Sequence, residues 1–300
     1  MGEQTARIGD IELAYEVGGD PAGAPMLLIM GLGAQMILWP DDLVAELGAR
    51  GFRTVRFDNR DCGRSTWIEG GPEPNPLAAL AGDVSSASYT LEDMAADAAG
   101  LLDHLGIGEA HVVGASMGGM IAQTLAIRHP RRARSLASIM STTGDRAVGM
   151  PKPEVLPALL TPPPATREGT VEWAERMFAI IGSPGFEPDR EWVADVAGRE
   201  FDRGQNPLGT ARQLMAIAAS GDRTQALRGV GAPAVVIHGA ADPLVPISGG
   251  RATAEAIPGA DLVVIEGMGH DLPRGAWPRI VDAIVANAQR ATARDAARAS

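Results

Sequence analysis

The chain has 300 residues, 45% of them hydrophobic and 21% charged, which is the composition of an ordinary globular protein long enough to bury a sizeable core. The formal net charge of −11 at pH 7 argues against nucleic acid or an anionic membrane surface as a partner. Since Cys62 is the single cysteine, the chain can form neither an internal disulfide nor a cysteine-based metal cluster.

The N-terminal part of the chain carries two clear strand patterns. The first six residues lack a basic start followed by an apolar run, so we expect no signal peptide and a cytoplasmic protein. Residues 11–17 alternate apolar and polar side chains, which is typical of an antiparallel edge strand. Residues 26–30 are continuously apolar and indicate a strand covered on both faces. The longest apolar stretch, around 25–38, is interrupted by glycines and a glutamine and is too short to cross a membrane.

Helices and strands continue to alternate further along, apart from a turn-rich stretch over 70–88. Residues 90–93 open a helix in the manner of a capping box. The other predicted segments are strands over 54–57, 110–113, 136–140, 234–237 and 262–265, helices over 43–50, 120–127, 251–256 and 277–289, and a frayed tail over 290–300. This alternation predicts a mostly parallel sheet with helices on both faces.

One long segment interrupts the alternation. Between residues 142 and 230 no convincing buried strand is found, and a proline-rich lead is followed by helical segments that carry Trp173, Phe178 and Trp192. A block of this length between two sheet strands predicts a helical lid over residues 142–230. Residues 1–141 and 231–300 are then expected to form the core.

The pentapeptide Gly-Ala-Ser-Met-Gly at 114–118 lies between a predicted strand and a predicted helix. This is the context of a nucleophile elbow, a sharp turn that exposes its serine. The serine must adopt a strained backbone conformation, and its neighbours two positions away must be small because strand and helix nearly touch. Gly114 and Gly118 meet that requirement. Ser116 is therefore the candidate nucleophile, and a structural turn is the alternative.

A serine hydroxyl needs a general base, and the base needs an acid that orients it. Of the five histidines, His270 is the one that follows a predicted strand and a glycine-rich loop at the carboxyl end of the sheet, where ligand-facing residues lie. Asp242, in the turn after the preceding strand, is the candidate acid, and Asp145 is the alternative. The order Ser116, Asp242, His270 is the one expected for an α/β-hydrolase.

Five segments carry a wider pattern: Met30-Gly31-Leu32-Gly33, residues 58–65, residues 114–118, Asp242-Pro243 and residues 267–270. Together they resemble the α/β-hydrolase superfamily over nearly the whole chain, and in particular the aclacinomycin-methylesterase-like carboxylesterases. The resemblance implies an α/β-hydrolase fold with a mostly parallel eight-stranded sheet, helices on both faces and a helical lid insertion. It also implies a serine esterase that uses no cofactor and no metal.

The oxyanion hole of such an enzyme needs two backbone N–H groups aimed at the developing negative charge. They are expected from Met117, directly after the nucleophile, and from Leu32, in the loop after the 26–30 strand. Met30 stands where many relatives carry a histidine, a change that leaves the backbone donor in place. The 58–65 loop, which includes Cys62, is expected to brace the elbow.

The candidate lining of an apolar acyl pocket is Met36, Trp39, Trp173 and Phe178, and core packing is the alternative for each. We expect hydrolysis of carboxylic esters of small to medium apolar acids, or of methyl esters, through an acyl-enzyme. Carbon–carbon bond, lactone or amide hydrolysis and peracid formation with the same triad are alternatives. The non-enzyme alternative is an inactive hydrolase fold that serves as a ligand receptor. Neither the natural small-molecule ester nor the oligomeric state follows from the sequence.

Overall fold

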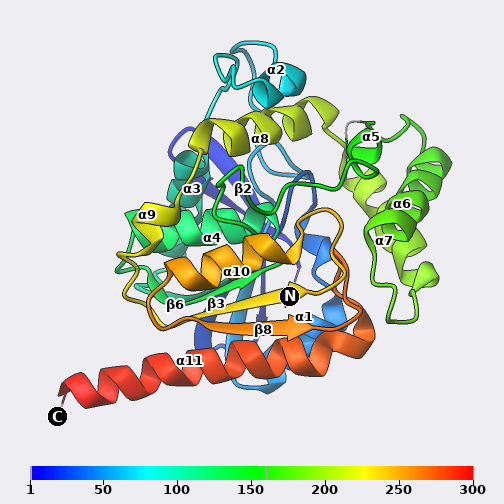
Figure 1. Cartoon of the computed structure of the whole chain (residues 1–300). Coiled ribbons are helices and arrows are strands. Elements are labelled where there is room, and N and C mark those ends of the chain that lie inside the picture. The colour runs from blue at the N-terminus through cyan, green and yellow to red at the C-terminus, as the bar shows by residue number, and fades with distance from the viewer. Residues whose placement is uncertain (1, 160, 300) are drawn as a thin grey trace.

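The computed structural model of the chain describes residues 2–159 and 161–299 and shows a twisted sheet between layers of helices (Figure 1). Over these residues the sheet has eight strands: β1 (Gln4–Ile8), β2 (Ile11–Gly19), β3 (Ala24–Ile29), β4 (Phe52–Phe57), β5 (Ala110–Ala115), β6 (Ala133–Ile139), β7 (Ala234–Gly239) and β8 (Asp261–Ile265). Their order across the sheet is β1-β2-β4-β3-β5-β6-β7-β8. The predicted eight-stranded sheet is confirmed.

Most of the sheet is parallel, and its antiparallel part lies at one edge. The strands from β4 to β8 all run in one direction, whereas β2 is antiparallel to both of its neighbours, β1 and β4. The prediction of an edge strand over 11–17 is therefore wrong, because β1 pairs along β2 and forms the edge itself. Only Ala6 of β1 is buried, so this short strand has almost no hydrophobic pattern in the sequence.

Helices cover both faces of the sheet. The helices outside the β6–β7 connection are α1 (Asp41–Ala49), α2 (Pro76–Leu80), α3 (Leu91–His104), α4 (Met117–Arg128), α10 (Ile247–Ala256) and α11 (Trp277–Ala299). Leu27 and Ile29 of β3 belong to the core beneath α3 and α4, whereas Met26 and Leu28 belong to the core beneath α1 and α11. The prediction that this strand is covered on both faces is confirmed.

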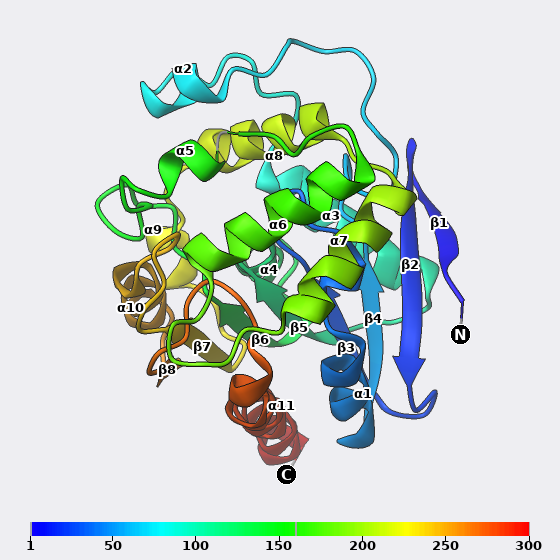
Figure 2. The same ribbon diagram turned by 90° about the vertical axis from the view of Figure 1, so that its right-hand side faces the viewer.

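Helices fill the connection between β6 and β7. They are α5 (Leu156–Leu159), α6 (Arg167–Ile181), α7 (Arg190–Arg203), α8 (Pro207–Ser220) and α9 (Thr224–Leu227). Figure 2 looks toward the carboxyl ends of the parallel strands, where α6 and α7 cross in front of the sheet and α8 lies above it. Helix α6 packs along α7, α8 contacts α2 and α3, and α9 contacts α4 and α10. The segment thus covers the carboxyl ends of the parallel strands, where open parallel sheets bind ligands.

Two local predictions have different outcomes. The capping box is confirmed, since Thr90 Oγ1 accepts from the N–H of Glu92 (3.2 Å) and Asp93 Oδ2 accepts from the N–H of Thr90 (2.8 Å). The frayed tail is wrong for residues 290–299, because α11 continues to Ala299 and Arg290 ties it to Asp261 and to backbone carbonyls. Within the described ranges no helix has the length and apolar character that crossing a membrane requires.

Candidate active site

Ser116 occupies the sharp turn between β5 and α4. Its φ is +56°, a backbone conformation that residues other than glycine rarely adopt. Ser141 Oγ donates to the carbonyl of Ser116 at 2.8 Å and supports the turn. A Cβ on Gly114 would lie 2.1 Å from the carbonyl oxygen of Gly118, and a Cβ on Gly118 would lie 2.0 Å from that of Ile29. Strand and helix therefore approach so closely that no side chain larger than hydrogen fits at either position.

Three side chains from separate strand ends meet at this turn. His270, in the loop after β8, places Nε2 2.9 Å from Ser116 Oγ and Nδ1 2.7 Å from Asp242 Oδ2. Asp242 lies in the turn after β7, where its Oδ1 accepts from the N–H groups of Leu244 and Val245 (2.9 and 2.8 Å). These bonds hold the carboxylate toward the imidazole, and the imidazole toward the hydroxyl. A serine in this arrangement can pass its proton to the ring.

The alternative acid lies elsewhere. Asp145 Oδ1 accepts from the N–H of Ala147 at 2.9 Å and closes a local turn, and it forms no hydrogen bond with His270 in the described structure. His238 lies beside Asp242, with 3.7 Å between Nε2 and Oδ2, but its Nε2 donates to a backbone carbonyl at 2.7 Å. Burial lowers the pKa of His238, so the neutral ring packs behind the aspartate.

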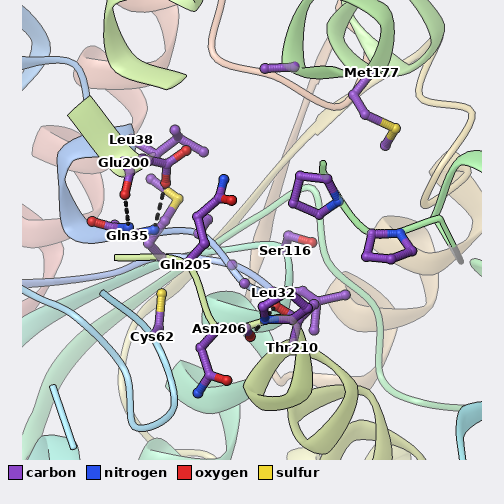
Figure 3. A pocket seen from close by; sticks show the side chains of 18 of the residues that line it. Leu32, Gln35, Leu38, Cys62, Ser116, Met177, Glu200, Gln205, Asn206 and Thr210 are labelled. Carbon is purple, nitrogen blue, oxygen red and sulfur yellow. Dashed lines mark hydrogen bonds between the residues drawn. The ribbon is translucent and has the colours of Figure 1, made fainter. Parts of the chain in front are cut away.

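Two backbone N–H groups beside Ser116, those of Leu32 and Met117, form no hydrogen bond with another described residue. Met117 begins α4, so its N–H has no partner within the helix. The loop that carries Leu32 approaches the serine closely, and a Cβ on Gly31 would lie 3.2 Å from Ser116 Cβ. Figure 3 shows Leu32 next to Ser116. Two backbone N–H groups without a protein partner are the type of donor that an oxyanion hole uses.

The connection between α6 and α7 holds the loop that carries His270. Three hydrogen bonds join residues 181–185 to residues 267–270: from His270 N to the carbonyl of Ile181 (2.7 Å), from Gly269 N to Ser183 Oγ (2.8 Å) and from Gly185 N to the carbonyl of Gly267 (2.9 Å). Ser183 Oγ donates in turn to Asp271. The segment between α6 and α7 therefore helps to fix the position of the His270 imidazole.

A cavity of about 590 Å³ opens onto Ser116 (Figure 3). The part of its apolar wall that α6 and α7 contribute includes Trp173, Met177, Phe178, Ile181 and Trp192. The prediction that Met36 and Trp39 line this cavity is wrong, because both are almost fully buried in the core. Met36 packs against Val196 of α7, and Leu38 reaches the cavity in its place.

The opposite end of the cavity is polar (Figure 3), a feature that was not predicted from the sequence. Its lining includes Gln35, Asp61, Glu200, Gln205 and Asn206. Glu200 belongs to the last turn of α7, where a charged side chain ordinarily faces water. Here it lies partly buried in the cavity wall, and burial raises its pKa to about 7. The one available hint was the position of Gln35, three residues after Leu32.

Known proteins are similar to this chain in sequence and fold. The family model described as alpha/beta hydrolase fold matches residues 24–273. The chain belongs to the α/β-hydrolase family. Rhodomycin D methylesterase DauP from Streptomyces sp. (strain C5) is 30% identical over 94% of this chain and 97% of its own. Two solved structures are 26% identical: the enol-lactonase from Burkholderia xenovorans LB400 (TM-score 0.74, covering 95% of this chain and 99% of that one) and a thermophilic esterase from Thermogutta terrifontis (0.72, 97% and 99%).

In this α/β-hydrolase the 58–65 loop braces the loop that carries Leu32 rather than the elbow. Asp58 Oδ1 accepts from the N–H of Met36 (2.7 Å), and Asn59 Nδ2 donates to a carbonyl earlier in the same loop (3.0 Å). Arg203 of α7 forms an ion pair with Asp58 from above. Cys62 is buried and burial raises the pKa of its thiol, so the sulfur remains protonated.

The chemistry open to this α/β-hydrolase follows from its groups. A hydroxyl, an imidazole, a carboxylate and two N–H donors are the components of acyl transfer through a covalent intermediate. Within residues 2–159 and 161–299, no group of three or more His, Cys, Asp or Glu side chains is placed to hold a metal ion.

Proposed function

We propose that the protein is a serine hydrolase of carboxylic esters, with Ser116, His270 and Asp242 as its catalytic triad. The observation that carries this proposal is the continuous hydrogen-bond chain from Ser116 Oγ through His270 to Asp242. The likeness to a methylesterase at 30% identity and to a thermophilic esterase at 26% supports ester hydrolysis.

In the proposed mechanism Ser116 Oγ attacks the ester carbonyl carbon while His270 Nε2 accepts the hydroxyl proton. The N–H groups of Leu32 and Met117 stabilise the resulting oxyanion. His270 then gives its proton to the leaving alkoxide, which departs as the alcohol and leaves the acid esterified to Ser116. Water attacks this acyl-enzyme as His270 takes a proton from it, the carboxylic acid is released and the serine is restored. Asp242 remains ionised and orients the ring throughout.

The cavity supports esters of small to medium apolar acids, or methyl esters of bulkier acids, as substrates. Its volume of about 590 Å³ is that of a site for a whole organic molecule, and its wall on α6 and α7 is apolar and aromatic. The name of the relative DauP, a rhodomycin D methylesterase, supports a methyl ester as the substrate.

Lactone hydrolysis is the second candidate. The likeness to the enol-lactonase from Burkholderia xenovorans, at 26% identity and a TM-score of 0.74, favours it. A lactone is a cyclic ester, so the same steps would open the ring and leave the alcohol attached to the acid.

The proposal includes a lid. Residues 142–230 cover the strand ends and supply the aromatic wall, whereas residues 1–141 and 231–300 form the core that carries the triad. The lid would exclude water from the acyl-enzyme and select the esters that enter.

A panel of esters, lactones and amides of graded acyl and alcohol size, assayed with the purified protein and with Ser116→Ala, tests the function. We expect Ser116-dependent hydrolysis of esters, with kcat lower by roughly 10⁶-fold in the variant. Activity on amides alone, or hydrolysis that survives in Ser116→Ala, would contradict the proposal.

A further inference from the structure

Most polar side chains at the polar end of the cavity are already engaged by the protein. Gln35 Nε2 donates to the carbonyls of Glu200 and Gly204 (2.8 and 2.9 Å), and its Oε1 accepts from Arg203 (2.6 Å). Asn206 caps α8 and donates to Asp61. The Asp61 carboxylate accepts hydrogen bonds from four groups: the side chains of Tyr89, Asn206 and Arg212 and the N–H of Ile68. These groups serve to hold the cavity wall together.

Glu200 and Gln205 are different, because each retains a polar atom without a partner. Glu200 Oε1 accepts from the N–H of Gln35 at 2.9 Å, and Oε2 forms no hydrogen bond with another described residue. Thr170 Oγ1 donates to the carbonyl of Pro164 at 3.1 Å and lies 3.3 Å from Gln205 Oε1, and Gln205 Nε2 forms no hydrogen bond with another described residue. Both side chains line the cavity, and Figure 3 shows them close to each other on one side of it. An acceptor and a donor therefore remain available on one side of the cavity.

The surrounding charges leave Glu200 without an ion-pair partner among the described residues. Arg203, the cation whose field reaches Glu200, is bound to Asp58 and Glu3. The Asp58 carboxylate opposes ionisation of Glu200, and the buried Cys62 thiol adds no charge. Oε2 of this partly buried carboxyl has no protein donor among the described residues, so a ligand group that donates to Oε2 would be bound favourably.

We propose that Glu200 and Gln205 form a subsite for a hydroxyl group of the substrate, remote from the bond that is cleaved. A hydroxyl can donate to Glu200 Oε2 and accept from Gln205 Nε2 at the same time, whereas an ammonium can only donate. The inference rests on the proposed esterase function and narrows its substrate class to hydroxylated esters.

The chain itself limits the length of such a substrate. Leu32, the proposed oxyanion donor, and Gln35, which binds Glu200, are three residues apart, a separation of at most about 11 Å. With the hydrogen bonds at both ends added, the hydroxyl therefore lies within roughly 15 Å of the ester carbonyl. A rigid body of two fused six-membered rings fits within this limit.

Matched esters of one ring system test the subsite. The acid series is the methyl esters of naphthoic acids that carry a hydroxyl, a methyl or an aminomethyl group on the far ring, and the alcohol series is the acetates of the corresponding naphthylmethanols. Each is assayed for kcat/KM with the wild type, Glu200→Gln, Gln205→Leu and the control Glu191→Gln, an exposed position on the same helix. Glu200→Gln retains an acceptor for Gln35, and Gln205→Leu leaves the contact between Gln35 and Glu200 intact.

We expect the wild type to favour the hydroxyl ester over the methyl ester by about tenfold or more in one of the two series. Glu200→Gln and Gln205→Leu should each reduce that ratio severalfold, and Glu191→Gln should leave it unchanged. Preference for the aminomethyl ester would replace the hydroxyl assignment with a cation site. Ester hydrolysis with no hydroxyl preference in either series would overturn this inference alone, whereas absence of Ser116-dependent hydrolysis would overturn the proposed function as well.

Discussion

The carboxyl ends of the parallel strands and the helices that cover them are built in different ways. At the strand ends, backbone contacts fix the reactive groups. No Cβ fits at Gly114 or Gly118, and the Asp242 carboxylate is held by two backbone N–H groups. In the helical segment, side-chain packing sets the shape of the cavity, as where the rings of Phe178 and Trp192 meet edge to face at 6.1 Å. The contrast indicates that the strand ends supply the reactive groups and that the helices determine which substrates are accepted.

The two regions are nevertheless connected. Residues 181–185 bind the backbone of the loop that carries His270, and Arg203 of α7 pairs with Asp58 beneath the loop that carries Leu32. A change in the helices can therefore reach the reactive groups when it alters one of these connections. A change in the apolar wall alone should affect only the choice of substrate.

The largest effect is expected at the strand ends. Asp242→Asn should lower kcat by about 10⁴-fold, because the imidazole loses the carboxylate that orients it. The protein should remain folded, as thermal unfolding would verify. Asp145→Asn is the matched control and should stay within about twofold of the wild type, since Asp145 only closes a local turn. If Asp145→Asn were the more damaging change, the acid would be misassigned.

The next effect concerns the connection between the regions. Arg203→Met would leave the Asp58 carboxylate buried without its cation, and we expect the free energy of unfolding to fall by about 3 kcal/mol. Arg199→Met, on the same helix but with a side chain that is 42% exposed, should change it by less than about 0.5 kcal/mol. Urea unfolding measures both, and equal stability of the two variants would mean that α7 is not anchored through Asp58.

A smaller effect depends on pH. Burial raises the pKa of Glu200 from 4.5 to about 7, so between these values the folded protein holds a proton that the unfolded chain has released. The free energy of unfolding should therefore fall as pH rises from 5 to 8, with a contribution from Glu200 of about 2 kcal/mol after allowance for solvent in the cavity. Glu200→Gln should lose this contribution, and other buried carboxyls affect both proteins equally. Parallel pH profiles of stability would contradict the enclosure of Glu200.

The smallest effect is expected in the apolar wall. Trp173→Ala and Phe178→Ala should change the relative kcat/KM among esters of different acyl length by about threefold to tenfold, because each side chain lines the cavity. Ile180→Ala is the control, since Ile180 lies on the same helix and is exposed to solvent. Lower stability with unchanged relative rates would show that the aromatic residues are core and that selectivity arises elsewhere.

The contrast between the regions also explains what the sequence could predict. The elbow, the buried strand at 26–30 and the capping box at Thr90 have short-range patterns that force a local conformation. The positions of Ser116, Asp242 and His270 follow from strand order, and the structure brings the three side chains together. These features belong almost entirely to the sheet and its turns.

The features that the sequence did not predict depend on tertiary contacts. Met36 and Trp39 are apolar residues in the right loop, and only the 3-10 turn at Met36–Leu38 decides that Leu38 faces the cavity in their place. Arg290 prolongs α11 through contacts with distant carbonyls. Glu200 is one of several charged residues on α7, and nothing in its sequence surroundings indicates that the helix end would be enclosed.

The most direct test of the proposed reaction is mass spectrometry of the purified protein after treatment with a fluorophosphonate, followed by peptide mapping. A fluorophosphonate reacts with a serine only when a neighbouring base activates its hydroxyl, so the label reports on Ser116 and His270 together. We expect a single adduct on Ser116 that is absent from Ser116→Ala and formed much more slowly in Asp242→Asn. An unlabelled wild type, or a label that persists in Ser116→Ala, would contradict the assignment of Ser116 as the nucleophile.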